Sequence, residues 1–208
     1  MKGRLITFEG IDGSGKSTQA SLLHRYLLYS GYIARLLREP GGTDIGERIR
    51  SILLDTAHDD MSPVTEVFLY LAARAQITSR VIVPALVSGE HVVMDRFLDS
   101  TTVYQGFARG LGMEEMKRLN LFATGGVVPD LTFVIDCDPR LSLTRVDGAP
   151  DRLESEGIGF MKRVRAGFLT LCESEKKRMV CIDGNRGIDD IHVDVRRAVD
   201  RLFAAQKD

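Results

Sequence analysis

The sequence feature that most constrains this chain is a glycine-rich segment close to its beginning. Residues 10–17 read Gly-Ile-Asp-Gly-Ser-Gly-Lys-Ser and fit the pattern G-x-x-x-x-G-K-[ST] at every constrained position. An apolar, strand-like run at 5–8 precedes the segment, and apolar residues at helical spacing follow it over 17–29. Such a turn directs backbone N–H groups at phosphate oxygens, and the adjoining helix N-terminus favours negative charge. We therefore predict a phosphate-binding loop; the alternative is an ordinary glycine-rich turn.

Two side chains of this loop have roles that follow from phosphate chemistry. Lys16 is expected to neutralise the outer phosphates of a nucleoside triphosphate, and the Ser17 hydroxyl is expected to hold Mg²⁺. The residues predicted to bind the triphosphate are Gly10, Ile11, Asp12, Gly13, Ser14, Gly15, Lys16, Ser17 and Thr18.

The composition is that of an ordinary globular chain. The 208 residues suffice for one compact domain, 1–208, and a net charge of -1 gives no electrostatic footprint for nucleic acid or an anionic membrane. Three cysteines without metal-ligand spacing argue against a disulfide framework and suit a reducing cytosol. No apolar run approaches the ~20 residues of a membrane span, and the first strand follows the N-terminus directly. We expect a cytoplasmic protein with small-molecule partners, in which Cys137, Cys172 and Cys181 are buried.

Short apolar runs alternate with helical patterns along the chain. This alternation predicts an α/β fold, a five-stranded parallel sheet flanked by helices on both faces, with ligands beyond the carboxyl ends of the strands. Acidic residues follow the strands at those ends. For Asp136 and Asp183 the alternative is that they simply mark loops. The predicted strands cover residues 4–8, 32–37, 91–94, 131–135 and 179–182, and the acidic residues that follow them are Glu9, Glu39, Asp95, Asp136 and Asp183.

A phosphate loop alone does not separate a kinase from a GTPase, but the chain has no Asn-Lys-x-Asp sequence for reading guanine. Over nearly its whole length it resembles bacterial thymidylate kinases, which are P-loop nucleoside monophosphate kinases. The resemblance implies transfer of a phosphoryl group from MgATP to dTMP, giving dTDP for de novo and salvage dTTP biosynthesis, by a homodimer. The motifs that carry it are Phe8–Thr18, Arg38–Thr43, Ala72–Arg74, Asp95–Arg96 with Ser100 and Tyr104–Gly106, and Asp151-Arg152-x-Glu154.

Three of these residues lie where the acceptor is expected. Asp12 places an extra carboxylate inside the phosphate loop, where it would repel donor phosphates unless it faced another group. The resemblance implies that this group is the 3′-hydroxyl of the acceptor deoxyribose; the alternative is a turn-stabilising role. Glu39 and Pro40 follow the second strand and would form only a turn by themselves, but the resemblance places them beside the chemistry.

Tyr70 and Arg74 are four residues apart in a helical pattern over 63–87, so they share one face. The resemblance implies that Tyr70 stacks on thymine and Arg74 hydrogen-bonds its carbonyl edge; the alternative is a core tyrosine and a surface arginine. The helix itself could serve the core or an interface. For Arg48 and Arg50, on the preceding predicted helix, we expect a solvated face.

Asp95 and Arg96 follow the third strand and bring a carboxylate and a cation to the same edge of the sheet. The carboxylate can hold Mg²⁺ and the guanidinium can grip the acceptor phosphate, unless the two form a plain surface ion pair. The resemblance adds base reading by Thr101 and Gln105, a ring beneath the sugar from Tyr104, and an acceptor contact from Ser100. The predicted metal ligands are Ser17 and Asp95; Asp95 is also predicted to contact the substrate, and Arg109 is a further candidate for the surface of the site.

A break at 147–151 suggests a short lid at about 145–156. Some relatives carry an arginine at the position of Gly13, and the resemblance is to those that supply catalytic arginine from the lid instead. This lid is poor in arginine. The predicted catalytic residues are Lys16, Arg96, Arg145 and Arg152. Two alternatives are a kinase for another deoxynucleotide or a deoxynucleoside, and a nucleotide-binding regulatory protein without activity.

Overall fold

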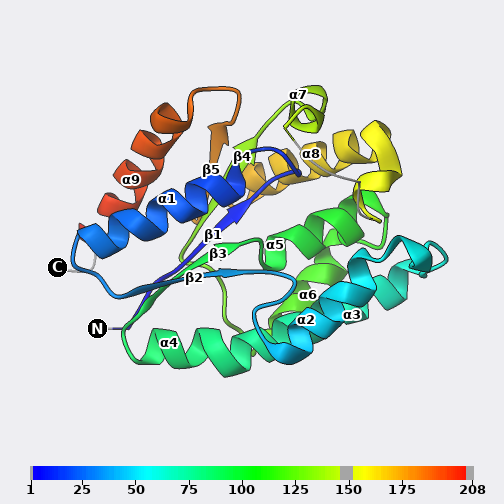
Figure 1. The fold of residues 1–208 in the computed structure, drawn as a ribbon, viewed down its shortest axis with the longest axis horizontal. Helices are drawn as coiled ribbons and strands as arrows, with labels where there is room; N and C mark the ends of the chain where they lie inside the picture. Colours follow the sequence, from blue (N-terminus) through cyan, green and yellow to red (C-terminus); the bar gives the residue numbers. More distant parts are fainter. Residues whose placement is uncertain (1, 146–151, 205–208) are drawn as a thin grey trace.

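The computed structural model describes residues 2–145 and 152–204. Its centre is one parallel sheet in the order β2-β3-β1-β4-β5, which confirms the predicted fold class (Figure 1). β1 is buried along its whole length, whereas β2 at the edge is half exposed. Within the described ranges no helix combines the length and the apolar character needed to cross a membrane. The strands are β1 (Leu5–Glu9), β2 (Ala34–Arg38), β3 (His91–Asp95), β4 (Leu131–Asp136) and β5 (Met179–Asp183).

Helices cover both faces of this sheet. The helical pattern predicted over 63–87 is helical throughout, but it includes a wide turn at Thr78–Ile82, just before Pro84, whose missing N–H removes one bond from the regular ladder. The α-helices are α1 (Lys16–Tyr29), α2 (Asp44–Leu54), α3 (Pro63–Ile77), α4 (Val83–Val87), α5 (Leu98–Thr101), α6 (Met113–Ala123), α7 (Pro139–Leu143), α8 (Gly157–Ser174) and α9 (Ile188–Ala204); wide turns η2 (Thr78–Ile82) and η3 (Thr102–Ala108) and short 3₁₀ turns η1 (Thr56–His58) and η4 (Glu154–Glu156) complete the set.

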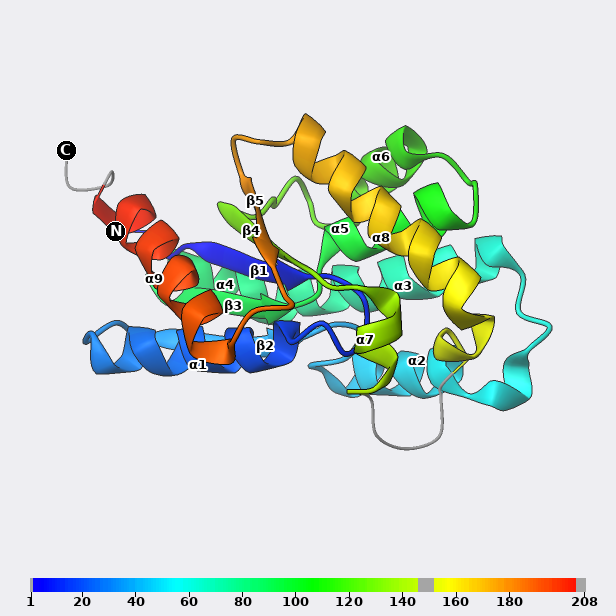
Figure 2. The ribbon, with the colours of Figure 1, turned by 90° about the horizontal axis from the view of Figure 1, so that it is seen from above.

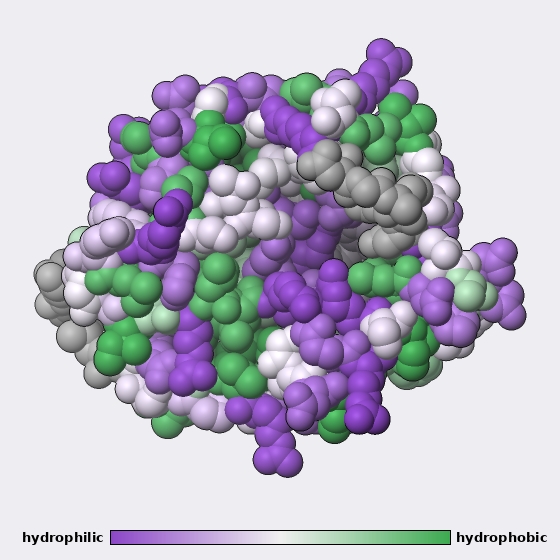
Figure 3. All heavy atoms as spheres, in the orientation of Figure 1, coloured by the Kyte–Doolittle hydropathy of each residue, from purple (hydrophilic) through white to green (hydrophobic). Residues whose placement is uncertain are grey.

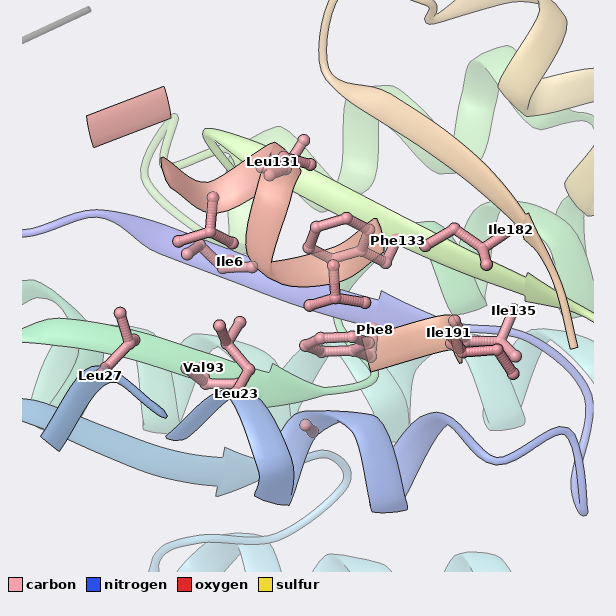
Figure 4. Packing of buried hydrophobic residues seen from close by; sticks show 14 of the residues in the cluster. Ile6, Phe8, Leu23, Leu27, Val93, Leu131, Phe133, Ile135, Ile182 and Ile191 are labelled. Atoms are coloured by element: carbon pink, nitrogen blue, oxygen red, sulfur yellow. The ribbon is translucent and has the colours of Figure 1, made fainter. Parts of the chain in front are cut away.

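One face of the sheet packs against α1 and α9. Phe8 on β1 stacks on Phe133 of β4 with ring centroids 5.1 Å apart, and Leu23 of α1 and Val195 of α9 are fully buried in the same cluster (Figure 4). The opposite face is covered by residues of α3, α4, α5 and α8. Figure 1 shows α4 across the strands from α1, and Figure 2 shows α5 and α8 there. Burial of apolar surface on both faces explains why the strands read as continuous apolar runs.

The cysteine prediction is correct for two residues and wrong for one. All three cysteines are free thiols, and Cys137 and Cys172 are buried as expected. Cys181 is exposed because β5 is an edge strand, where alternate side chains point away from the core.

Candidate active site at the carboxyl ends of the strands

The predicted phosphate loop joins β1 to α1. Gly15, with φ 96°, precedes the first residue of α1, and this left-handed conformation is one that a glycine adopts without strain. The loop and the start of α1 form one side of a groove, and the other side comes from Arg145 and the segment that follows β5. The groove residues are Gly13–Gln19, Arg145, Gly184, Arg186, Ile188 and Ile191.

Gly184, on the far wall of the groove, lies close to the phosphate loop. A Cβ added at this residue would lie 2.8 Å from Ile135 Cγ2, 2.9 Å from the Asp136 carbonyl oxygen and 3.2 Å from the Ser14 carbonyl oxygen. Only a glycine therefore lets the segment after β5 pack directly on the loop. The contacts of this segment could not be predicted from the sequence, because β5 and the phosphate loop are far apart in the chain.

Three charged side chains meet at the inner end of the groove. Lys16 Nζ donates to Asp12 Oδ1 at 3.1 Å, and Arg96 NH2 donates to the same oxygen at 2.7 Å. Burial alone would raise the pKa of Asp12, but Arg96 and Lys16 lower it well below its ordinary range. Asp12 is therefore an anion that holds two cations in place before any phosphate binds.

Arg96 has the one positive φ, 66°, among the non-glycine residues that the structure describes. Its NH1 donates to the Gly10 carbonyl at 2.9 Å and to Ser100 Oγ at 3.1 Å, and its guanidinium lies 5.2 Å from the centre of the Tyr104 ring. Residues other than glycine occupy this backbone region only where the surroundings hold them. These contacts fix the fork of Arg96 between the loop and the helix that follows β3.

Glu9 is linked to Arg96 through Ser100, which accepts a hydrogen bond from Arg96 and donates one to Glu9. Its carboxylate accepts hydrogen bonds from the Phe97 N–H at 2.8 Å and from the Ser100 hydroxyl at 2.5 Å. Burial and the nearby Asp99 carboxylate raise the pKa of Glu9 to about 7. Sequence reasoning noted Glu9 only as an acidic residue at a strand end and assigned it no role.

Ser17 and Asp95 form the predicted metal pair. Ser17 Oγ donates to Asp95 Oδ2 at 2.5 Å, while Asp95 Oδ1 is buried without a hydrogen-bond partner. An unpartnered carboxylate oxygen beside a hydroxyl is the kind of oxygen donor set that Mg²⁺ takes together with phosphate oxygens. The residues therefore fit a magnesium ion at the mouth of the phosphate loop.

A second polar pocket opens on the other side of Asp12 and Arg96. It brings together all the predicted substrate residues except Asp95, and Figure 3 shows a recess lined by hydrophilic side chains in the middle of this face. Glu39 Oε1 and the Tyr104 hydroxyl are buried there without partners, as expected of groups that await a ligand. The lining residues are Asp12, Glu39, Pro40, Arg50, Leu54, Tyr70, Arg74, Arg96, Ser100, Thr101, Tyr104, Gln105 and Leu153.

Arg74 forms the floor of this pocket and is only 1% exposed. Its Nε donates to Glu39 at 2.9 Å, NH1 donates to Thr101 at 2.9 Å and Asn120 at 2.6 Å, and NH2 donates to the Phe97 carbonyl and forms an ion pair with Glu39 at 2.7 Å. These four hydrogen bonds use four of the five N–H groups of the guanidinium. In this arrangement Arg74 shapes the pocket and directs most of its N–H groups to the protein.

Arg50 corrects an expectation. It lines the acceptor-side pocket and donates to the Pro40 carbonyl at 3.1 Å, so a solvated face is the wrong account of this residue, although it holds for the exposed Arg48. Asp136 and Asp183 are the last residues of β4 and β5 and are bound to other protein groups: Asp136 pairs with Arg165, and Asp183 accepts from the Asn185 backbone N–H.

The two lid arginines lie on different sides. Arg145 lines the donor groove and donates to the Gly184 carbonyl at 3.2 Å. Arg152 is 7% exposed; its Nε donates to the Leu53 carbonyl at 2.9 Å and its NH2 to Glu66 at 2.5 Å. Residues 146–151 of the predicted lid lie outside the described residues.

Glu66 is a further residue near the site to which the sequence assigned no role. It is 1% exposed and accepts hydrogen bonds from Gln105, Arg109 and Arg152. A signal was present, because Glu66 stands one helical turn before Tyr70 and so belongs to the same face of α3. Arg109 lies in this cluster and not in the lining of the pocket.

A phosphate loop, a hydroxyl–carboxylate pair for magnesium and a second polar pocket at the same sheet edge define a P-loop kinase that phosphorylates a small acceptor. Residues 8–195 match the family described as "Thymidylate kinase". The chain is 48% identical to the thymidylate kinase of Thermoanaerobacter sp. (strain X514) over 196 residues, which are 94% of this chain and 96% of that protein. The chain belongs to the thymidylate kinase family.

Two further likenesses extend over almost the whole chain. The thymidylate kinase of Caldanaerobacter subterraneus subsp. tengcongensis is 46% identical over 208 residues, which cover 100% of both chains. The crystal structure of thymidylate kinase from Ehrlichia chaffeensis is 32% identical and superposes with a TM-score of 0.78, covering 96% of this chain and 99% of that one.

Proposed function

We propose that this protein carries out the reaction of its family, the transfer of the γ-phosphoryl group of ATP to dTMP, which yields ADP and dTDP. The observation that carries the proposal is the meeting of two polar recesses at Asp12, Lys16 and Arg96. One recess has the phosphate loop and the other has the aromatic and hydrogen-bonding groups suited to a nucleotide monophosphate. A donor in the first and an acceptor in the second would face each other across these charges.

Acceptor binding is assigned to the pocket beyond Arg96. Arg96 would grip the phosphate in fork geometry, and Asp12 would accept from the sugar 3′-hydroxyl once a phosphate has drawn the cations outward. Tyr70 and Tyr104 supply rings for the base and the sugar. Gln105 supplies an amide to the edge of the base.

Donor binding is assigned to the groove at the phosphate loop. Backbone N–H groups of the loop and Lys16 would hold the phosphates, and Ser17 with Asp95 would hold Mg²⁺. Bound there, magnesium neutralises negative charge on the donor phosphates. Arg145 already lies on this groove, whereas a catalytic contact from Arg152 requires its guanidinium to leave Glu66.

Phosphoryl transfer requires that the donor and acceptor be aligned and that their negative charges be compensated. The acceptor phosphate is itself the nucleophile, so no covalent intermediate with the protein is needed. Lys16 and Arg96 would bring two phosphate chains together that otherwise repel each other, and Asp12 fixes the distance between these two cations.

A coupled ADP-release assay with MgATP tests the proposal against dTMP, dUMP, dGMP, CMP and thymidine. Turnover that is highest with dTMP supports it, and a higher rate with another acceptor would favour the alternative kinase instead. ATP binding without acceptor-dependent ADP release would favour the regulatory alternative, which family membership does not support. Lys16→Ala should abolish turnover and leave the circular dichroism spectrum unchanged.

We also propose that the chain forms a homodimer in the cytoplasm. Large apolar side chains on the adjacent helices α3 and α6 are exposed: Phe68 is 60% exposed and Phe122 is 90% exposed. Light scattering at micromolar concentration tests the dimer, with Phe122→Ser as the variant expected to weaken it. The organisation of 1–208 as a single domain stays a prediction.

A further inference from the structure

Glu66 occupies a position that no role in the proposed reaction explains. It lies on α3 behind the acceptor pocket, where its side chain is 1% exposed. A buried carboxylate is costly unless cations and hydrogen-bond donors surround it, and such groups are kept where they fix a geometry. Its partners come from two separate parts of the chain: Gln105 and Arg109 at η3 and its end, and Arg152 before η4.

The two arginines determine the protonation state of Glu66. Arg109 donates to both carboxylate oxygens, at 2.8 and 3.1 Å, and Arg152 donates to Oε2 at 2.5 Å. Burial alone would raise the pKa of Glu66, but hydrogen bonds from Arg109, Gln105 and Arg152 lower it overall. Arg109 is fixed in turn by Glu156 and by the Phe160 ring. Glu66 is therefore an anion near neutral pH, and an ionised carboxylate only accepts hydrogen bonds.

The Glu66 carboxylate, as a hydrogen-bond acceptor, determines how the side-chain amide of Gln105 is oriented. A glutamine amide has a donating end and an accepting end, and rotation by 180° exchanges them. Glu66 Oε1 accepts from Gln105 Nε2 at 2.7 Å, so the reversed orientation would set the amide oxygen against a carboxylate oxygen. The amide oxygen is thereby the end of Gln105 left for a ligand in the pocket that this residue lines.

We propose that Glu66 is a specificity-determining positioning residue, which fixes the Gln105 amide with its oxygen toward the acceptor base and so selects pyrimidines that carry an N3–H over those with an unprotonated N3. Thymine presents a donor at N3 and cytosine presents an acceptor there. An amide that cannot rotate matches the first and repels the second. The inference rests on the proposed function, because it concerns the same acceptor pocket.

The test compares kcat/KM for dTMP and dCMP in the full-length protein. Glu66→Gln removes the charge while keeping the size, and a glutamine at 66 can donate as well as accept, so Gln105 becomes free to reverse. We expect the ratio of kcat/KM for dTMP over dCMP to fall about tenfold or more. The KM for MgATP should stay within about twofold, because the donor groove is lined by other residues. Glu114→Gln, which removes an exposed carboxylate paired with Lys117 on α6, is the matched control and should leave the ratio unchanged.

A second variant tests the role of the Gln105 amide without removing the buried charge of Glu66. Gln105→Met removes the amide and should lower the same ratio, and adding Glu66→Gln to it should lower the ratio no further. An unchanged ratio in either single variant, or additive losses in the double variant, would overturn the inference. These outcomes presuppose a wild-type chain that phosphorylates dTMP; a wild-type chain that does not would refute the proposed function itself. Thermal unfolding of each variant separates loss of fold from loss of selectivity.

Discussion

Arg74 allows a demanding test of how the acceptor pocket is held together: we predict that Arg74→Met lowers the free energy of unfolding by about 3–5 kcal/mol. Methionine is flexible and fills much of the same space, so the loss is chiefly electrostatic. Arg74 is 1% exposed and is bound to Glu39, Thr101, Asn120 and the Phe97 carbonyl. Removing the guanidinium leaves the Glu39 carboxylate buried without its cation, and breaking a buried pair in this way costs that amount.

The loss should grow as pH rises. Burial raises the pKa of Glu39 above its ordinary value of 4.5, and the Arg74 cation opposes that rise. Without Arg74 the pKa of Glu39 goes up further, so the folded chain favours the neutral acid. A carboxyl group with a raised folded-state pKa contributes stability below its unfolded pKa, and this contribution is lost as pH rises through the folded value. The variant should therefore be closer to wild type at about pH 5 than at about pH 8.

Urea unfolding followed by far-UV circular dichroism measures both effects. Adding Glu39→Gln to Arg74→Met removes the stranded charge and should restore part of the lost stability and flatten its pH dependence. Arg35→Met is the matched control, because Arg35 is bound to Glu90 in an exposed pair where little effect is expected. A stability of Arg74→Met within about 1 kcal/mol of wild type at both pH values would refute the reasoning.

Three further predictions use other parts of the site. Gly184→Ala should raise the KM for MgATP several-fold with little effect on the KM for dTMP, because its Cβ would lie 3.2 Å from the Ser14 carbonyl oxygen; equal changes in both KM values would contradict this. Glu9→Gln should gain stability relative to wild type by up to about 3 kcal/mol between pH 4.5 and 7, measured by urea unfolding, since burial raises the pKa of Glu9 to about 7 and the wild-type contribution is lost across that interval. Asp95→Asn should raise the magnesium concentration needed for half-maximal turnover about tenfold or more, and an unchanged magnesium requirement would remove Asp95 from the proposed metal site.

The α/β fold class could be predicted from local sequence patterns. The inner strands are short apolar runs, because both faces of a parallel sheet are covered, and each strand is followed by helical spacing. The order of strands in the sheet did not follow from these runs. It is decided by pairing between residues that are distant in the chain: β1 lies between β3 and β4, and Ile6 pairs with Val93 on β3 and with Leu131 on β4.

The site divides in the same way. The phosphate loop, the acidic strand ends and the shared face of Tyr70 and Arg74 are visible in the sequence, because each depends on spacing within one segment. The surroundings of Arg74 and the place of Arg50 on the acceptor pocket are not visible there. Both depend on contacts between helices that are remote in the chain.

The sequence by itself determined a phosphate loop between a strand and a helix, a parallel sheet and the residue types gathered at its carboxyl edge. Only the tertiary structure decided that the guanidinium of Arg74 is bound to other protein groups. It also decided that Glu66 lies with Gln105, Arg109 and Arg152 in one buried cluster. The physical reason is that a motif encodes local backbone geometry, whereas the charge and hydrogen-bond partners of a buried side chain are set by the packing of segments far apart in the sequence.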